Sequence, residues 1–425
     1  MMGSPVLARR AGGCKGAWSD QTRRVERGGM RHLLRSGMVA ALGLGAVMSV
    51  SLTEAASSAA VAGPPSLTLS IRKVDRDVVG ERTPGMAGIK YGAEGGEVLG
   101  DDQGTLHWFT SEQYADPYWV VNRIAHWTSK DGLTWHRDPR WVKEGNHDQT
   151  GTLDKSDYFD PTLVYDRKTG YWYMFYVGYR YSKAKTWYVA KIYRAKSMVP
   201  GRAGLGGPYH DNDADDVVVL APVAHPAPYE AKWVGDTKRG YGAASVTIYR
   251  AGDIWYMLWA ENMLATASAP SGTFTRLPEG PNNPVTFGRP PMDWITNYIA
   301  TPIQEHFYFE NPIVIRIPSH RVGAGTYLMV AGNYTDASLG VTRATCGYAT
   351  SPDGLHWSEV RPLNPGFGGC TTALSLLPEA DGSYTMFITD RDFVEQKAGE
   401  LQSSGTIVLP SFESMSRVEV SVARP

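Results

Sequence analysis

The stretch "FDPTLVYDRKTGYWYMFYVGY", residues 159–179, decides the fold. A short apolar run follows an Asp-Pro pair, a polar turn containing Gly170 ends it, and a second, aromatic-rich run follows. Two such runs joined by a short glycine-containing turn are typical of a β-hairpin. The strand that begins at Asp160 otherwise has the composition of a buried strand. The question is why a carboxylate stands at its start.

Four further stretches repeat this pattern, beginning at Ala93, Ala243, Phe309 and Cys370. The five units therefore start roughly 60 to 85 residues apart, which is the spacing of a repeat architecture. Additional strands follow the hairpins, and the shared motif S-x-D-G-L-x-W in "SKDGLTW" and "SPDGLHW" indicates further hairpin turns with a structural role. Five four-stranded units predict an all-β protein, a five-bladed β-propeller.

Composition and charge narrow the function. The 425 residues carry a formal net charge of -1, so the chain lacks the positive charge expected of a protein that binds nucleic acid or an anionic membrane surface. The aromatic fraction of 11% suits both the cores of the blades and a groove lined with rings. We expect no nucleic-acid partner, no membrane association of the mature chain, and a monomer.

The N-terminal region has the order of a secretory signal. Basic Arg31 and Arg35 precede an apolar stretch from Met38 to about Leu52, and small residues follow it. The apolar stretch is short for a membrane span, although an anchor remains an alternative. We therefore expect residues 1–62 to be signal peptide and leader, residues 63–425 to form a single propeller domain, and the protein to be secreted or periplasmic. Met30 is an alternative start.

The number and spacing of the three cysteines indicate which disulfide and metal sites the chain can form. Cys14 belongs to the leader, so Cys346 and Cys370 remain in an exported chain, either as a disulfide or as two buried thiols. No CxxC or HExxH spacing is present, which gives no indication of a zinc site. We expect no cofactor, with a structural calcium ion at the acidic run 211–216 as an open alternative.

The strand-start position of the repeats carries acidic residues. Aligned on their apolar pairs, "EGGEVL", "DPTLVY", "ASVTIY" and "ENPIVI" begin with Glu94, Asp160, Ala244 and Glu310. The innermost strand of every blade lines the central channel of a propeller, so three carboxylates are predicted to converge at one mouth. A buried carboxylate is costly unless it is paired or functional. The alternative is that each acid caps a turn or pairs with an arginine.

A second set of polar residues is expected at the same mouth. The second strand of each hairpin runs back to the point where the first begins, and two residues shortly before Glu310 lie close to it. The candidates for substrate binding from these segments are Glu112, Arg180, Glu261, Asn333, Asp390, Arg391, His306 and Tyr308.

The Asp-Pro strand start, the later "ENP" and the five hairpins resemble the five-bladed glycoside hydrolases of family 43 and the related invertases and levansucrases. The resemblance covers roughly residues 85 to 410. It implies that Glu94 is the general base, Asp160 the residue that tunes the acid, and Glu310 the general acid. Glu94 stands where the family has aspartate, and Glu310 lies on the fourth blade rather than the third.

The resulting expectation is a secreted glycoside hydrolase that acts on a carbohydrate with two carboxylates, by inversion. Two alternatives remain. One is a carbohydrate-binding propeller without catalysis. The other is a polysaccharide lyase, for which Tyr308, His306 and Arg180 are the candidate residues.

Overall fold

The computed structural model describes residues 67–424 apart from internal gaps. The gaps are residues 116–120, 149, 151, 153–156, 183–186, 211–216, 221–229, 234–236, 241–245, 260–262, 278–284, 288–306, 337–340, 364–368 and 391–411. All described residues lie in one unit of the chain, Ala60–Pro425. Across these ranges, no helix has the length and apolarity that a membrane span requires.

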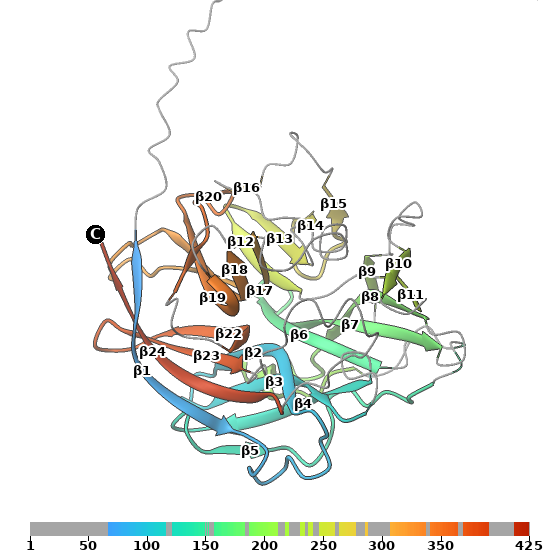
Figure 1. Ribbon diagram of the computed structural model, residues 1–425. Coiled ribbons are helices and arrows are strands. Elements are labelled where there is room, and N and C mark those ends of the chain that lie inside the picture. The colour runs from blue at the N-terminus through green and yellow to red at the C-terminus, as the bar shows by residue number, and fades with distance from the viewer. Residues whose placement is uncertain are drawn as a thin grey trace, which may run out of the picture. The chain divides into compact units, whose positions relative to one another are not determined.

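Blades I and III are built from consecutive antiparallel strands, whereas blade II has a non-consecutive strand order and one parallel pairing (Figure 1). Blade I consists of β2 (Ala93–Gly100), β3 (Leu106–Gln113), β4 (Asn122–Ser129) and β5 (Trp135–Arg137). Blade II consists of β6 (Asp157–Asp166), β7 (Tyr171–Ser182) and β8 (Trp187–Lys196), extended by β9 (Val217–Leu220), β10 (Glu230–Trp233) and β11 (Thr237–Gly240). Blade III consists of β12 (Thr247–Ala251), β13 (Ile254–Trp259), β14 (Met263–Ala267) and β15 (Thr275–Arg276). A single-turn 3₁₀ helix, η1 (Arg202–Gly206), follows β8.

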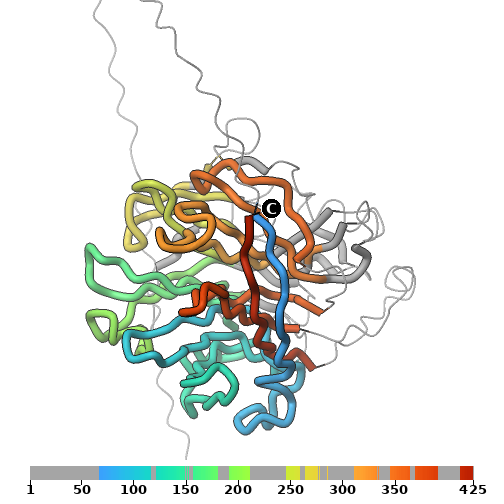
Figure 2. Tube along the Cα trace, turned by 90° about the vertical axis from the view of Figure 1, so that its left-hand side faces the viewer, coloured from blue at the N-terminus to red at the C-terminus, as the bar shows by residue number. Residues whose placement is uncertain are grey.

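Blades IV and V complete the ring, and the two ends of the domain meet in blade V. Blade IV consists of β17 (Phe307–Arg316), β18 (Tyr327–Asp336), β19 (Val341–Ser351) and β21 (Arg361–Pro362), and beside it β16 (Thr286–Phe287) pairs with β20 (His356–Trp357). Blade V consists of β22 (Cys370–Pro378), β23 (Tyr384–Asp390), β24 (Ser414–Ala423) and β1 (Thr68–Val79). Strands β1 and β24 run antiparallel side by side (Figure 2).

The five innermost strands form a closed ring. Strand β2 contacts β6, β6 contacts β12, β12 contacts β17, β17 contacts β22, and β22 contacts β2. These are the first strands of the five units predicted from the sequence. The five-bladed all-β propeller is therefore confirmed, whereas the use of residues 68–79 as the outer strand of the last blade was not predicted.

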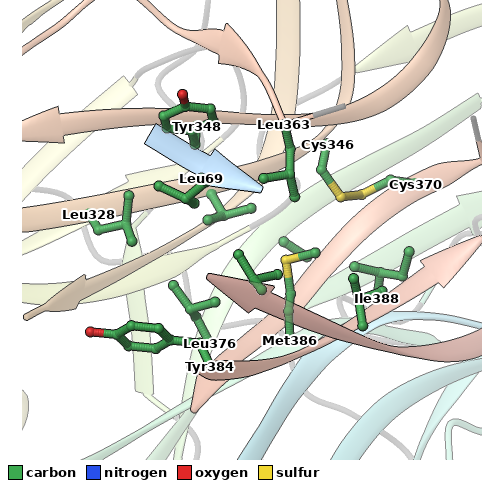
Figure 3. Close-up of a cluster of buried hydrophobic side chains, with 14 of the residues drawn as sticks. Leu69, Leu328, Cys346, Tyr348, Leu363, Cys370, Leu376, Tyr384, Met386 and Ile388 are labelled. Atoms are coloured by element: carbon green, nitrogen blue, oxygen red, sulfur yellow. A yellow bond between two sulfur atoms is a disulfide. The ribbon is translucent and has the colours of Figure 1, made fainter. Parts of the chain in front are cut away.

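Each interface between neighbouring blades has its own apolar cluster. The cluster between blades IV and V brings Leu328 of β18 against Leu376 and Ile388 of blade V, and Leu69 of β1 covers it (Figure 3). Equivalent clusters lie between the four other neighbouring pairs. Both faces of a blade are thus buried, which explains the aromatic-rich strands. Most of these rings are core residues, and Tyr179 is only 1% exposed.

The two S-x-D-G-L-x-W motifs are hairpin turns, as predicted. In blade I the carboxylate of Asp131 accepts hydrogen bonds from the backbone N–H groups of Leu133 and Thr134, and Gly132 has a φ of 70°. In blade IV, Asp353 accepts the corresponding hydrogen bonds, and Gly354 has a φ of 80°. A left-handed residue in the turn accounts for the glycine at this position of the motif.

Cys346 of β19 and Cys370 of β22 form a disulfide. Their Cα atoms lie 5.3 Å apart, inside the range of about 4.4 to 6.8 Å that such a bond requires. The bond therefore joins the third strand of blade IV to the innermost strand of blade V. Of the two alternatives that the sequence left open, the disulfide is confirmed.

Removing this disulfide should destabilise the domain. The two cysteines are 24 residues apart, and a cross-link that closes a loop of this size lowers the entropy of the unfolded chain by the equivalent of about 3 kcal/mol. We expect the double substitution Cys346→Ser, Cys370→Ser to lower the free energy of unfolding in urea by about this amount. A reducing agent should destabilise the wild type similarly and leave the variant unchanged. Equal stability of the oxidised wild type and the variant would contradict this expectation.

Candidate functional site

A small pocket lies where the five innermost strands meet. Every blade contributes to its lining, which consists of Gly96, Glu97, Asp160, Pro161, Thr162, Val246, Thr247, Asn311, Pro312, Ile313, Thr372 and Ala373. Its two carboxylates, those of Asp160 and Glu97, come from blades II and I. The pocket is therefore the central channel of the propeller, and Asp160 faces it as the sequence predicted.

A β-bulge at the start of three innermost strands turns residues toward the channel. The regular pairing of β6 with β7 is interrupted after Phe159, and that of β17 with β18 after Glu310. The next residues, Asp160 and Asn311, both have a φ of 47°, and Gly95 at the corresponding point of β2 has a φ of 66°. Aspartate and asparagine are among the few non-glycine residues that tolerate this left-handed conformation.

The bulges correct the alignment of the strand-start acids. Asp160 is structurally equivalent to Gly95 and Asn311, whereas Glu94 and Glu310 both hold the preceding position, which is Phe159 in blade II. The prediction that the three acids share one repeat position is therefore wrong by one residue for Asp160. The error arose because Val98 was aligned with Val164, whereas the register of the strands makes it equivalent to Leu163. Glu94 and Glu310 remain equivalent to each other.

The carboxylate of Asp160 lies directly over blade I. A Cβ atom added to Gly95 would come within 1.8 Å of Asp160 Oδ1, so the side chain occupies the space that this glycine leaves open. The backbone N–H of Asp160 donates a hydrogen bond of 2.8 Å to Ser111 Oγ on β3. With 4% exposure, this carboxylate is held at the junction of blades I and II. These contacts explain why an acid can stand at the start of a buried strand.

Glu94 lies beside this junction on the preceding position of β2. Its carboxylate accepts a hydrogen bond from the side-chain amide of Gln113, the last residue of β3, and Thr110 Oγ1 donates to its backbone carbonyl. Glu94 is 8% exposed and Gln113 is fully buried. Glu94 does not itself line the pocket, so its carboxylate is held against the second strand of its own blade.

Glu97 is a channel residue that the sequence interpretation missed. Its Oε2 accepts hydrogen bonds from the backbone N–H of Leu163, at 2.7 Å, and from Thr162 Oγ1, at 3.0 Å, both on β6. Glu97 thus ties blade I to blade II. Desolvation in the channel raises the pKa of this carboxyl to about 7, although the two hydrogen bonds oppose the shift.

The raised pKa of Glu97 predicts a pH-dependent stability. The folded state binds this proton more tightly than the unfolded state, so the contribution of Glu97 is complete below about pH 4.5 and is lost as the pH rises through 7. A shift of this size corresponds to about 3 kcal/mol. Glu97→Gln keeps an acceptor for Leu163 but cannot ionise. We expect the variant to become more stable relative to the wild type between pH 4.5 and 8, measured by urea unfolding. A constant difference in stability across this range would contradict the assignment.

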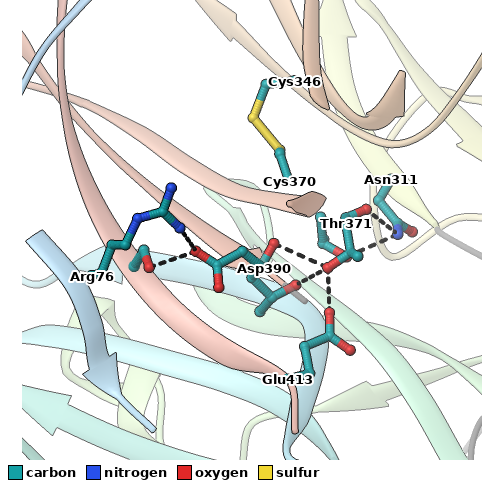
Figure 4. Close-up of a disulfide and its surroundings, with 10 residues drawn as sticks. Arg76, Asn311, Cys346, Cys370, Thr371, Asp390 and Glu413 are labelled. Carbon is teal, nitrogen blue, oxygen red and sulfur yellow. Dashed lines mark hydrogen bonds and ion pairs between the residues drawn. A yellow bond between two sulfur atoms is a disulfide. The ribbon is translucent and has the colours of Figure 1, made fainter. Parts of the chain in front are cut away.

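Blades IV, V and I are joined at the mouth by a polar network (Figure 4). The side-chain amide of Asn311 donates to Thr372 Oγ1 at 2.9 Å and to the backbone carbonyl of Thr371 at 3.4 Å. The hydroxyl of Thr371 contacts the fully buried carboxylate of Glu413. The backbone of Glu413 pairs in turn with Tyr91 and Gly92, just before β2. Contacts with blade V therefore hold the segment that leads into the first strand of blade I.

Two of the predicted substrate-binding residues point into their blades. Glu112 is fully buried, accepts hydrogen bonds from Arg137 at 2.8 and 3.1 Å, and accepts a third from the indole of Trp127. Asp390 accepts a hydrogen bond of 2.8 Å from Ser416 Oγ and pairs with Arg76 at 3.4 Å, both on outer strands of blade V (Figure 4). These contacts give both carboxylates a structural role and do not support the substrate-binding role that we expected.

The remaining predicted residues lie outside the described residues or in strands for which the backbone alone is described. Glu261, His306, Arg391 and the acidic run 211–216 lie outside the described residues. The backbone, but not the side chain, is described for Arg180 in β7, Tyr308 and Glu310 in β17, and Asn333 in β18. Glu310 pairs with Gly332 at the last regular position before the bulge, which is the place that Glu94 holds in blade I.

The arrangement of blades defines the class of protein, a five-bladed β-propeller with a carboxylate-bearing central channel. No protein-family model and no curated protein matches the sequence.

Among solved structures, the chain is similar to a family 117 glycoside hydrolase from the marine bacterium Zobellia galactanivorans, with 12% identity, a TM-score of 0.50, and coverage of 84% of this chain and 90% of that one. It is also similar to exo-β-1,3-galactanases from Phanerochaete chrysosporium and Clostridium thermocellum, with 13% and 14% identity and TM-scores of 0.47 and 0.45. The similarity covers 82% and 80% of this chain but only 64% and 61% of the galactanases. The similarity to the family 117 hydrolase, at 12% identity, confirms the resemblance for the fold alone.

Proposed function

We propose that the protein is a glycoside hydrolase whose active site lies at the mouth of the central channel. In this proposal Asp160 contacts the sugar and tunes the general acid, Glu310 is the general acid, and Glu94 is the general base. Hydrolysis of a glycosidic bond requires one carboxylic acid that protonates the leaving oxygen and one carboxylate that activates water. A third carboxylate nearby favours the protonated form of the acid.

The observation that carries the proposal is the placement of Asp160. Its carboxylate lines a pocket to which all five blades contribute, and a left-handed bulge together with Gly95 holds it there. A non-glycine residue in this conformation carries a cost, and such positions cluster at functional sites. Glu94 and Glu310 hold equivalent positions on blades I and IV, which fits a pair of catalytic carboxylates that act from two sides of one sugar.

Product analysis tests the proposal. The purified mature protein would be incubated with plant, algal and bacterial polysaccharides, and both new reducing ends and unsaturated uronides would be measured. A hydrolase releases reducing ends without the ultraviolet absorption of an unsaturated product. Unsaturated products would instead establish the lyase. Equal product formation by wild type and the triple variant Glu94→Gln, Asp160→Asn, Glu310→Gln would overturn the assigned site.

One observation favours a carbohydrate-binding propeller as the second candidate. Blade IV has the amide of Asn311 where blade II has the carboxylate of Asp160, and that amide is engaged with Thr371 and Thr372. Because blade IV contributes an amide instead of a second carboxylate at this position, the channel wall suits carbohydrate binding as well as catalysis. Saturable glycan binding with no release of product from any bound glycan would establish this candidate.

We also propose that the protein is exported. The support is the signal-like leader together with the disulfide between Cys346 and Cys370, a bond that persists in oxidising compartments. Residue Leu67 is buried in the cluster between blades IV and V, so cleavage of the leader must leave it in place. N-terminal sequencing of the protein recovered outside the cytoplasm tests this, with a start between residues 57 and 63 expected.

A further inference from the structure

Three side chains at the junction of blades I and II form a hydrogen-bonded triad that the proposed mechanism does not use. Nδ1 of His147 lies 2.8 Å from Oδ1 of Asp157, the first residue of β6. The hydroxyl of Tyr114, the residue after β3, contacts both ring nitrogens of His147, at 2.6 Å from Nε2, and lies 3.5 Å from Oδ1 of Asp157. The three groups come from separate segments, so the fold itself brings them together.

The triad has a direction. A carboxylate can only accept hydrogen bonds, so Oδ1 of Asp157 accepts from Nδ1 of His147 and from the Tyr114 hydroxyl. The oxygen of Tyr114 retains lone pairs that can accept a hydrogen bond from a further group. The side chain of Asp157 is 1% exposed while that of His147 is 30% exposed, so the chain runs from the interior to the surface.

The surroundings hold the triad in place. His147 has a φ of 53°, a left-handed conformation that is uncommon for a side chain of this size. The ring of Tyr114 meets the imidazole edge-on, with 4.7 Å between ring centres, and the guanidinium of Arg123 lies 4.0 Å from the Tyr114 ring centre. A strained residue held by ring contacts on a partly open surface is the kind of feature that marks a binding site.

The triad lies close to the proposed catalytic residues but too far from them to act on the same bond. Asp157 precedes Asp160 by three residues on β6, which corresponds to at most roughly 10 Å along the strand, because the bulge at Asp160 shortens it. Reacting atoms must approach to about 3–3.5 Å. Gln113, which donates to Glu94, is the residue before Tyr114. A sugar at the triad would therefore be a neighbour of the sugar at Asp160 in the same chain.

The charges beside the triad favour a neutral sugar over a uronic acid. Arg137 is paired with Glu112 at 2.8 Å, and Arg123 lies 3.7 Å from Glu144 and also feels the charge of Asp157. A carboxylate thus lies beside each of these arginines, and Nε of Arg123 has no hydrogen-bond partner among the described residues. A sugar carboxylate would add a negative charge beside Asp157, whereas a sugar hydroxyl can donate to Tyr114 and accept from water.

We propose that Tyr114, His147 and Asp157 form a subsite that binds a neutral sugar unit adjacent to the unit whose glycosidic bond is cleaved. The proposal rests on the proposed glycoside hydrolase function and adds a residue set that selects the substrate. Asp157 and His147 are positioning residues, and the hydroxyl of Tyr114 makes the contact with the sugar.

The test is direct binding in the Asp160→Asn background, where turnover of a bound glycan should be slowed by at least about a hundredfold. A glycan array of neutral and uronate-containing oligosaccharides identifies the probe, and calorimetry then measures its affinity for Tyr114→Phe and His147→Asn added to that background. Phenylalanine keeps the ring beside Arg123, and asparagine tolerates the left-handed backbone at residue 147. Tyr165→Phe, at the far end of β6, is the matched control.

We expect Tyr114→Phe and His147→Asn each to weaken binding of the neutral oligosaccharide about tenfold, as loss of a single hydrogen bond does, with unchanged thermal midpoints and no effect of Tyr165→Phe. In the otherwise wild-type chain, the same two substitutions should raise KM for oligosaccharides and spare short aryl glycosides. Unchanged affinity in both variants, equal loss in Tyr165→Phe, or binding of uronate-containing glycans alone would overturn the subsite. Failure of the wild type to hydrolyse any glycan that it binds would overturn the hydrolase and not the subsite.

Discussion

Asp160→Asn should lower kcat by roughly 10²–10⁴-fold and leave the thermal midpoint close to that of the wild type. The substitution removes the negative charge from the channel without changing the size of the side chain. The fold should tolerate it, because Asn311 already adopts the same φ of 47° at the equivalent position of blade IV. The measurement is steady-state hydrolysis of the preferred glycan together with thermal unfolding.

The matched control for this substitution is Asp166→Asn at the other end of β6. Asp166 accepts a hydrogen bond of 2.7 Å from Ser271 Oγ and one of 2.9 Å from the backbone N–H of Lys168, and neither contact reaches the channel. We expect this variant to retain its kcat. If Asp160→Asn lost stability in proportion to activity, Asp160 would be a structural cap of its strand rather than a residue of the active site.

Glu310→Gln should separate substrates by their leaving groups. A general acid protonates the departing oxygen, so its loss should abolish hydrolysis of natural glycosides, whose leaving groups are poor. Activated aryl glycosides depart with little protonation and should retain most of their rate. The sequence places three aromatic residues, 307–309, directly before Glu310, which is a setting that disfavours the ionised carboxylate. The measurement is kcat for both kinds of substrate.

Glu94→Gln provides the comparison for Glu310→Gln. Glu94 holds the equivalent strand position on blade I, so the two substitutions remove the same group from the same strand position of two blades. Activation of water is needed whatever the leaving group, so Glu94→Gln should slow both kinds of substrate alike. The general-acid assignment fails if Glu310→Gln also slows both alike, or leaves both unchanged.

The repeat in the sequence was sufficient to predict the fold. Pairs of apolar runs joined by short turns recur five times, and the first run of each pair is the innermost strand of a blade. The prediction succeeded because each hairpin joins two strands that are adjacent in the sequence, so its pattern can be recognised locally. The six-stranded sheet of blade II and the pairing of β1 with β24 were not predicted, because such pairings depend on residues far apart in the sequence.

The site was predicted less well, and the bulges are the reason. An inserted residue reverses the direction in which the following side chains point, so an alignment on apolar residues gave Glu94 the equivalence with Asp160 that belongs to Gly95. The signal was present in the sequence. The paired glycines of "EGGEVL" and the Asp-Pro and Asn-Pro pairs mark the same bulge, and alignment on them would also have brought Glu97 into view.

The pairing of β1 with β24 has a consequence for how the chain is made. The backbone N–H of Asp77 bonds to Ser416, 339 residues later, and Leu69 lies in the cluster that these strands cover. During synthesis the first strand therefore waits without a partner until the last strand leaves the ribosome, and contacts of such long range form slowly. Until then β23 presents an open edge, which invites pairing with other chains. Because the propeller cannot close until β24 has been synthesised, the domain stays incompletely folded during translation. An incompletely folded chain is the form that can still be translocated across a membrane.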